Sequence, residues 1–324
     1  MSGFADICIA ALAGLAVALA AGATVGWAEK PLVRALRLVQ PDLRAAAQLA
    51  LLAAPLGLGV FTAVLIALSP HGMAFDLVPH HCHVTGPDCV AHEPASPTAA
   101  LSALGGGLMA AIALWIVFSL LDACQRAGAA LRLLMVASDP GGAGPARILR
   151  TDAVIALAAG FFRSRLFLSR GLCDRLDARE RDIVLAHEEA HGRRFDNLAR
   201  LIGAVFALGH WPRTALVLRG ELALAQEQSC DREAARHYGV LRAAETLVKV
   251  ERLKGEGPRS SFAAAYVDAP VAARVRALLE PDFAATGRSS AAILLTVLAC
   301  LAGVVLAAEP LHHEIETLAT LLQD

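Results

Sequence analysis

Lysine and arginine are confined to two windows of this 324-residue chain, and this feature constrains its fold most strongly. Four of the 29 basic residues lie between Lys30 and Arg44, and the other 25 lie between Arg126 and Arg288. The regions without basic residues contain long apolar runs. Charged residues make up only 18% of the chain, against about 25% in an ordinary soluble domain. The pattern predicts a membrane protein with one larger domain in water.

Four apolar runs are long enough to cross a bilayer, which takes about 20 predominantly apolar residues. They lie at 7–28, 45–69, 99–121 and 289–308. The first run is too long for a cleaved signal peptide and has no basic leader, so we expect it to remain as an anchor. The less favoured alternative is that some of the runs are buried helices of a soluble protein.

The charges also predict the orientation in the membrane, because basic residues favour the cytoplasmic side. The basic windows belong inside, whereas the N-terminus, the 70–98 loop and the 309–324 tail carry acidic but no basic residues and belong outside. We expect a multi-pass protein of a bacterial inner membrane with both termini in the periplasm. The chain then divides into transmembrane helices at 1–29, 45–69, 99–121 and 289–308, cytoplasmic parts at 30–44 and 122–288, and periplasmic parts at 70–98 and 309–324.

Residues 187–191 read H-E-E-A-H, which is an H-E-x-x-H motif. A capping-box pair, Asp177 and Glu180, precedes the motif and predicts that it lies on a helix. Two histidines four residues apart share one face of a helix, so both imidazoles can bind one zinc ion. Glu188 would lie beside that metal and take a proton from the bound water. We therefore expect a catalytic Zn²⁺ site with Glu188 as the general base.

A third zinc ligand is expected in the segment E-Q-S-C-D at 227–231. Glu227 and Asp231 share a helix face one turn apart. With His187 and His191, Glu227 would leave the fourth position of the zinc open to water, as a catalytic site requires. Asp231 could accept the free N–H of a ligand histidine. The alternative is an ordinary solvated acidic face.

These motifs resemble the BlaR/MecR antirepressor metallopeptidases, in which a cytoplasmic peptidase domain lies between the third and fourth of four spans. The E-x-x-C-D segment, with Cys230 in it, is similar to this family. The related HtpX-type membrane gluzincins usually carry E-x-x-A-D. The continuation H-G-R-R-F-D after His191 is similar to the family's H-x-x-R-R-D. The resemblance covers residues 1–308. Family members continue into an extracellular penicillin-binding sensor, so we expect a truncated form here.

The resemblance implies a fold with four transmembrane helices and an α+β gluzincin-type zinc metallopeptidase domain with a small edge sheet. Strands rich in β-forming residues are expected at 146–150, 153–159 and 165–168, and helices after Asp177. In gluzincins the last strand before the metal helix is an edge with which a substrate chain can pair. By resemblance, this edge lies near 154–160.

The apolar run at 198–211 is too short to span a bilayer. We expect it to lie at the membrane surface or against the spans. A helix buried in the soluble core is an equally open alternative.

The outer loop at 70–98 contains a cluster of histidines and two cysteines. In an oxidising periplasm Cys82 and Cys89 could form a disulfide. As a hypothesis, His80, His81 and His83 could bind a transition metal or sense pH. The favoured alternative is a disulfide-pinned polar loop with incidental histidines.

Peptide hydrolysis also needs a donor for the oxyanion. The candidates are Tyr238, His237 and Arg274. Arg274 ends the segment P-V-A-A-R, whose spacing resembles the Pro-x-x-x-Arg of HtpX-type gluzincins. Alternatively, Arg274, Arg276 and Arg288 complement the inner face of the membrane.

The preferred hypothesis is an integral membrane zinc metalloendopeptidase that acts in signal transduction. Its substrate would be a cytoplasmic or membrane-proximal protein, either a BlaI-like transcriptional repressor or its own chain. Its partners would be this substrate and the lipid bilayer, with a homo-oligomer left open. With a net charge of −1, the chain has no excess of basic residues to bind phosphates, so we expect no direct nucleic-acid partner. One alternative is an HtpX-like quality-control protease. Another is a non-catalytic zinc-binding signal-relay protein, against which the intact Glu188 argues.

Overall fold

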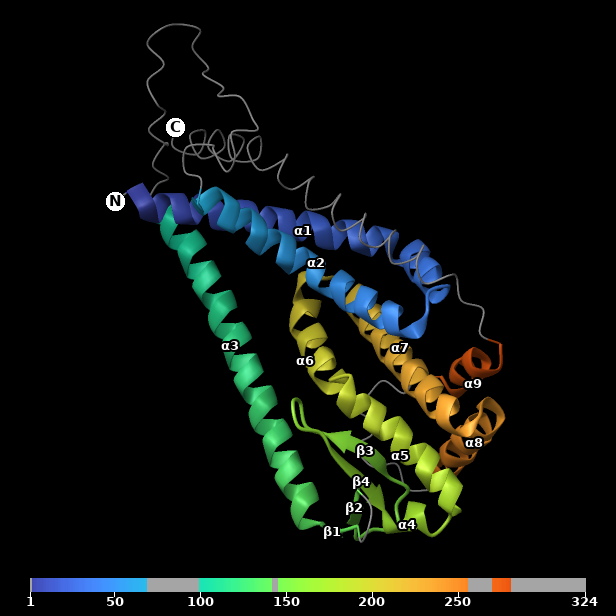
Figure 1. Cartoon of the computed structure of the whole chain (residues 1–324). Helices are drawn as coiled ribbons and strands as arrows, with labels where there is room; N and C mark the ends of the chain where they lie inside the picture. The colour runs from blue at the N-terminus through green and yellow to red at the C-terminus, as the bar shows by residue number, and fades with distance from the viewer. Residues whose placement is uncertain (1, 69–98, 142–144, 256–269, 281–324) are drawn as a thin grey trace, which may run out of the picture.

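The computed structural model describes residues 2–68, 99–141, 145–255 and 270–280. The expected fourth span at 289–308, the loop with His80, His81, His83, Cys82 and Cys89, and the tail at 309–324 lie outside these described residues. Within the described part, the chain is mostly helical and has one small sheet (Figure 1).

Three described helices are long and apolar enough to cross a membrane: α1 (Ser2–Arg37), α2 (Pro41–Leu68) and α3 (Ala99–Val136). They confirm helices at the first three apolar runs. Two of them continue beyond these runs. Helix α1 extends through much of the expected 30–44 loop, and α3 extends past Leu121 to Val136. The orientation of these helices relative to the two sides of a membrane stays a prediction.

Helices α1 and α2 pack closely as an antiparallel pair (Figure 1). At their crossing, a Cβ added to Gly14 would overlap the carbonyl oxygen of Gly59, and the reverse also holds. Small residues at a helix crossing allow this close approach of two backbones, which is how helices associate in lipid. Helices α1 and α2 therefore form one closely packed unit.

The sheet contains four short strands in the order β1-β2-β4-β3. They are β1 (Ser138–Pro140), β2 (Arg147–Leu149), β3 (Ala156–Ala159) and β4 (Arg165–Ser169). Strand β2 pairs with β4 in parallel, and the other two pairs are antiparallel. The three expected strands are confirmed, whereas β1 has no β-rich sequence and was not expected.

The position of the edge strand is partly confirmed and partly corrected. The two edge strands of the described sheet are β1 and β3, and β3 lies within the expected 154–160 region. The last strand before helix α5 is β4, which lies inside the sheet between β2 and β3, so the expectation that this last strand is the edge was wrong. The physical reason is burial: Leu166, Phe167 and Leu168 of β4 are all buried, and an edge strand could not cover them.

The helical part follows β4 along the chain. It contains α4 (Arg170–Cys173), α5 (Ala178–Arg193), α6 (Asp196–Phe206), the 3₁₀ helix η1 (Ala207–Gly209), α7 (Pro212–Tyr238), α8 (Val240–Gly255) and α9 (Val271–Leu279). Helix α5 begins at the predicted capping box of Asp177 and Glu180. Helix α6 with η1 corresponds to the apolar run at 198–211. It packs against α2, so the expected packing on the spans is confirmed.

Helix α7 connects the apolar helices α1 and α2 with the rest of the described fold. Its first half contributes Leu218, Leu222 and Ala225 to a buried cluster with Leu52 of α2. Its second half packs against α5, α8 and α9. Because one continuous helix belongs to both clusters, the position of α5 is fixed relative to α1 and α2.

Candidate metal centre

Helix α5 places His187 and His191 on the same face, one turn apart, as the H-E-x-x-H spacing predicts. The start of the helix is fixed by reciprocal hydrogen bonds of 2.8 Å between Asp177 and Glu180. Lys249 of α8 forms an ion pair with the Glu180 carboxylate. The two imidazoles approach each other through their Nε2 atoms, which are 3.2 Å apart.

Glu227 of α7 completes a cluster with these imidazoles. Its Oε2 lies 3.4 Å from Nε2 of His187, and its Oε1 lies 3.4 Å from Nε2 of His191. All three donor atoms lie within 4.8 Å of one another. The structure thus brings together the three side chains that the sequence indicated, although Glu227 follows His191 by 36 residues and lies on another helix.

The donor atoms have the separations that a tetrahedral zinc site needs. Bonds of 2.0–2.1 Å from zinc to nitrogen or oxygen place neighbouring ligand atoms about 3.3 Å apart. The three observed separations are 3.2, 3.4 and 3.4 Å. The type of donor fits as well, since two imidazoles and one carboxylate are a common catalytic zinc set. The residues present therefore fit the metal.

Carboxylates on the far side of each imidazole set its orientation. Nδ1 of His187 lies 3.0 Å from Oδ1 of Asp231, which is the arrangement expected for that residue. Nδ1 of His191 lies 2.7 Å from Oδ2 of Asp196, which is almost completely buried. A carboxylate that accepts the Nδ1 proton leaves Nε2 free to bind a metal.

Asp196 was not identified as a site residue from the sequence, although it ends the H-G-R-R-F-D segment. Its position depends on Phe195, which has a φ of 55° and precedes α6. This left-handed conformation is costly for a residue with a side chain. It turns the chain so that Asp196 at the start of α6 faces back toward α5. The acidic residue five positions after the second histidine was the available signal.

Two arginines hold the carboxylate groups of the cluster. Arg274 of α9 donates two hydrogen bonds to Asp231, and its Nη1 lies 3.3 Å from Oε2 of Glu227. Arg200 of α6 donates to Oε1 of Glu227 at 2.9 Å and to Gln226 at 2.7 Å. Arg274 thus contacts both Glu227 and Asp231 and acts here as a positioning residue. Arg200 had no sequence signal.

The electrostatic environment favours positive charge at the cluster. Burial opposes ionisation of the Glu227 carboxylate, but the two adjacent imidazoles hold its pKa well below the usual range. Burial also opposes protonation of His187, but Asp231 and Glu227 raise its pKa. For Asp231, hydrogen bonds from Arg274 outweigh burial and lower its pKa. A metal cation bound between the imidazoles would be stabilised by the same negative charges of Glu227 and Asp231.

Cys230 is buried beside the cluster but does not face its centre. Its Sγ lies 3.3 Å from Nδ1 of His191, on the Asp196 side of the ring. Burial raises the pKa of the thiol to about 12, so it stays neutral at physiological pH. Burial opposes protonation of His191, but Cys230, Glu227 and Asp196 raise its pKa well above 6.5. The thiol packs on the Nδ1 side of His191, where Cys230, His191 and Asp196 form a second, buried group of potential metal-ligand atoms, separate from the one with Glu227.

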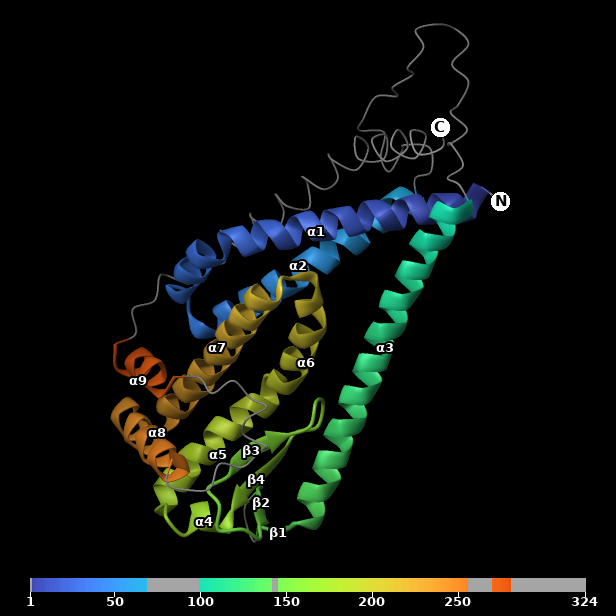
Figure 2. The same ribbon diagram turned by 180° about the vertical axis from the view of Figure 1, so that it is seen from behind.

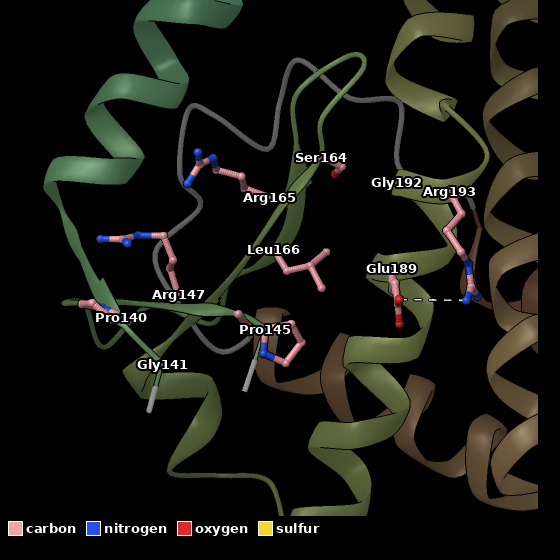
Figure 3. Close-up of a pocket in the computed structure, with 11 residues that line it drawn as sticks. Pro140, Gly141, Pro145, Arg147, Ser164, Arg165, Leu166, Glu189, Gly192 and Arg193 are labelled. Carbon is pink, nitrogen blue, oxygen red and sulfur yellow. Dashed lines mark ion pairs between the residues drawn. The ribbon is translucent and has the colours of Figure 1, made fainter. Parts of the chain in front are cut away.

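Glu188 and Glu189 follow His187 but differ in surroundings. Glu188 is half-buried, whereas Glu189 is exposed and pairs with Arg193 (Figure 3). Because Glu189 follows His187 by two residues, helix geometry places it on the face of α5 opposite the histidines. A cavity of about 580 Å³ lies on that opposite face, between α5 and the sheet. None of the three donor residues lines it, so it is separate from the candidate metal centre.

The other candidate oxyanion donors lie away from the cluster. His237 and Tyr238 are exposed at the C-terminal end of α7, where His237 pairs with Glu233. Asn197, next to Asp196, donates to the carbonyls of Ala158 and Gly160 and so fixes the edge strand β3 against the start of α6.

Comparison with known proteins adds an independent finding. Residues 108–278, more than half of the chain, match the family described as BlaR1 peptidase M56. The matched range contains the whole cluster from α5 to α9. Neither a curated protein nor a solved structure matches the chain.

Proposed function

Because the chain belongs to the BlaR1 peptidase M56 family, we propose that it is a zinc metalloendopeptidase of a bacterial inner membrane with its active site on the cytoplasmic side. The observation that carries this proposal is the cluster of His187, His191 and Glu227, whose donor atoms lie within 4.8 Å of one another. The three apolar helices support the membrane location. The basic composition of 122–288 supports the cytoplasmic side.

In this proposal His187, His191 and Glu227 hold the zinc ion. When bound, zinc supplies a Lewis acid that polarises a carbonyl and lowers the pKa of a water molecule. Asp196 and Asp231 keep the protons of the two imidazoles on Nδ1, so that Nε2 carries a lone pair toward the metal position.

Glu188 acts as general base and then as general acid. Its carboxylate accepts a proton from the attacking water and passes it to the amide nitrogen of the leaving group. The half-buried position of Glu188, one residue after His187 on α5, supports this role. Arg274 acts through Glu227 and Asp231, which it holds in place.

The free edge of β3 offers a place for the substrate backbone. An extended peptide can add to an exposed edge through main-chain hydrogen bonds. Strand β3 packs against α5. Asn197 donates to the carbonyls of Ala158 and of Gly160, which follows the strand, so the part of the edge before Ala158 is the part left for a peptide. A peptide on this edge would run alongside the helix that carries His187 and His191.

We assign the enzyme to signal transduction, with a cytoplasmic or membrane-proximal protein as its substrate. A BlaI-like repressor and the chain itself are the two candidates, as the family resemblance implies. Both would reach an active site located at the inner face of the membrane.

The experiment compares cellular proteins by N-terminal peptide mapping between the wild type and a Glu188→Gln strain. Glu189→Gln is the matched control, because Glu189 is the neighbouring residue on the opposite face of α5. We expect one cytoplasmic cleavage site that Glu188→Gln abolishes and Glu189→Gln retains. Many lost sites in misfolded membrane proteins would indicate quality control instead. Identical peptide maps for all three strains, with zinc bound in each, would point to a non-catalytic relay protein.

A further inference from the structure

The turn between α6 and α7 lies against the middle of both α1 and α2 (Figure 2). The carbonyl oxygen of Gly209 occupies the position that a Cβ on Gly22 of α1 would take. A Cβ on Gly209 would lie 2.9 Å from Cβ of Pro55 in α2. The turn therefore contacts both helices through glycine backbone.

These contacts lie inside the apolar stretches of the two helices. In α1, Gly22 precedes the charged Glu29 by seven residues, which is about 10 Å along a helix. In α2, Pro55 lies near the middle of the apolar stretch Pro41–Leu65. The turn thus reaches well past the last charged residues on the cytoplasmic side of both helices.

His210 contacts α2 at the same level. Its Nε2 lies 3.1 Å from the carbonyl oxygen of Leu52. The carbonyl that Pro55 leaves without a helical N–H donor is that of Leu51, one residue earlier. The buried His210 therefore adds a polar contact between the turn and α2.

The outer surface of this turn is apolar and exposed. Leu208, Trp211 and Leu216 are 47%, 65% and 61% exposed. The indole of Trp211 packs beside Gly26, and the next residue of α1, Trp27, is 89% exposed. Two tryptophans at one level are typical of the interfacial aromatic belt of a membrane protein.

We propose that this surface, formed by Leu208, Trp211 and Leu216, is immersed in the acyl chains of the cytoplasmic leaflet beside Trp27. Lipid is the occupant because Trp211 packs beside Gly26, so that the surface adjoins the exposed Trp27 of the long apolar helix α1. The α6–α7 hairpin is therefore a shallow membrane insertion between two transmembrane helices and the metal centre. The exposed Arg213 lies between Trp211 and Leu216 along the chain, and its long stem can extend to the headgroups.

The insertion has a consequence for the substrate. Helix α7 carries Trp211 at its start and Glu227 sixteen residues later, a separation of about 24 Å along a helix. The metal centre therefore lies within about 24 Å of the immersed turn. Segments close to the membrane are the ones that the site can reach.

The test uses the three tryptophans of the chain, Trp27, Trp115 and Trp211. The full chain with Trp27→Phe and Trp115→Phe keeps Trp211 as its single fluorophore. It is reconstituted into phospholipid vesicles with and without bromine atoms on the acyl chains. We expect bromolipids to lower the Trp211 fluorescence at least about twofold, and aqueous iodide to have little effect.

The matched control carries Leu241→Trp in a background with all three native tryptophans replaced by phenylalanine. Leu241 is exposed on α8, far from α1 and α2, and should show the reverse pattern. A second probe, Leu216→Trp in the same background, should behave like Trp211. Quenching of both turn probes by iodide alone would overturn the proposal. Protection from both quenchers would also overturn it, because protein would then cover the surface. Neither readout depends on proteolysis, so this result is separate from the test of the proposed activity.

Discussion

Arg274 holds the carboxylate of Asp231 with two hydrogen bonds of 2.8 and 2.7 Å, although the two residues are 43 positions apart in the sequence. Both side chains are almost completely buried. Asp231 in turn accepts from Nδ1 of His187, and Arg274 also contacts Glu227. The short helix α9 therefore contributes to the orientation of two of the three expected zinc ligands.

The first prediction concerns this bidentate contact. Arg274→Lys should weaken zinc binding about 10- to 100-fold, because an ammonium cannot replace the planar two-point contact of a guanidinium and Asp231 then holds His187 less firmly. Zinc affinity is measured by competition with a chromophoric chelator. Arg276→Lys, two residues along on the exposed side of α9, is the control and should leave affinity unchanged. Normal zinc affinity with reduced turnover in Arg274→Lys would instead support an oxyanion donor.

The second prediction concerns Asp196, which the sequence did not identify as a site residue. Asp196→Asn should lower zinc affinity about 10- to 100-fold, because an amide in contact with Nδ1 of His191 no longer fixes the ring in the metal-binding tautomer. Asp182→Asn, on the exposed side of α5, serves as the control. Equal zinc affinity in the two variants would contradict the role assigned to Asp196.

The third prediction concerns the third ligand. Glu227→Ala should lower the zinc-to-protein ratio of the purified chain, since it removes one of three protein donors. The ratio is measured by atomic absorption after dialysis against a weak chelator. Glu233→Ala lies on the same helix and pairs with Arg236 and Arg193 outside the cluster, so its zinc content should equal that of the wild type. An unchanged ratio in Glu227→Ala would exclude Glu227 as a ligand.

The fourth prediction tests the contact between α1 and the α6–α7 turn. Gly22→Ala should destabilise the protein by about 1–3 kcal/mol, because the new methyl group overlaps the Gly209 carbonyl and backbone cannot move aside as a side chain can. Gly57→Ala in α2 is the control, because an added Cβ there has no described atom within 4 Å. Thermal unfolding in detergent should show a lower midpoint for Gly22→Ala alone. Similar midpoints for both variants would mean that the turn is not held at this position.

The fifth prediction concerns pH. The Glu180 backbone N–H, which donates to Asp177, lowers the pKa of Asp177 below its ordinary value of 3.8. A carboxyl with a lowered pKa in the folded state adds stability above the unfolded value, and this stability is lost as the pH falls through the folded value. In Asp177→Asn the amide oxygen can still accept the hydrogen bond at the helix start, but the side chain carries no charge. The difference in unfolding midpoint between wild type and variant should therefore shrink as the pH falls below about 4.

Features that depend on local spacing could be predicted from the amino-acid order. The apolar runs define α1, α2 and α3, because their length and composition suit a bilayer whatever their neighbours are. The Asp177–Glu180 pair fixes the start of α5, and the i, i+4 spacing places His187 and His191 on one face. Glu227 and Asp231 could be selected for the same reason, since both lie one turn apart on a single helix.

The contacts between side chains that lie far apart in the sequence became visible with the tertiary structure alone. The contacts of Asp196 with His191, and of Arg200 and Arg274 with Glu227, join separate helices and leave no periodic pattern in the sequence. The interior position of β4 and the close contact of the Gly209 carbonyl with Gly22 likewise depend on how helices and strands pack. Local periodicity shows which face of a helix is apolar or carries ligands. Which other helix or strand packs against this face depends on the burial of apolar side chains and on close contacts between backbones. Both involve residues far apart in the chain.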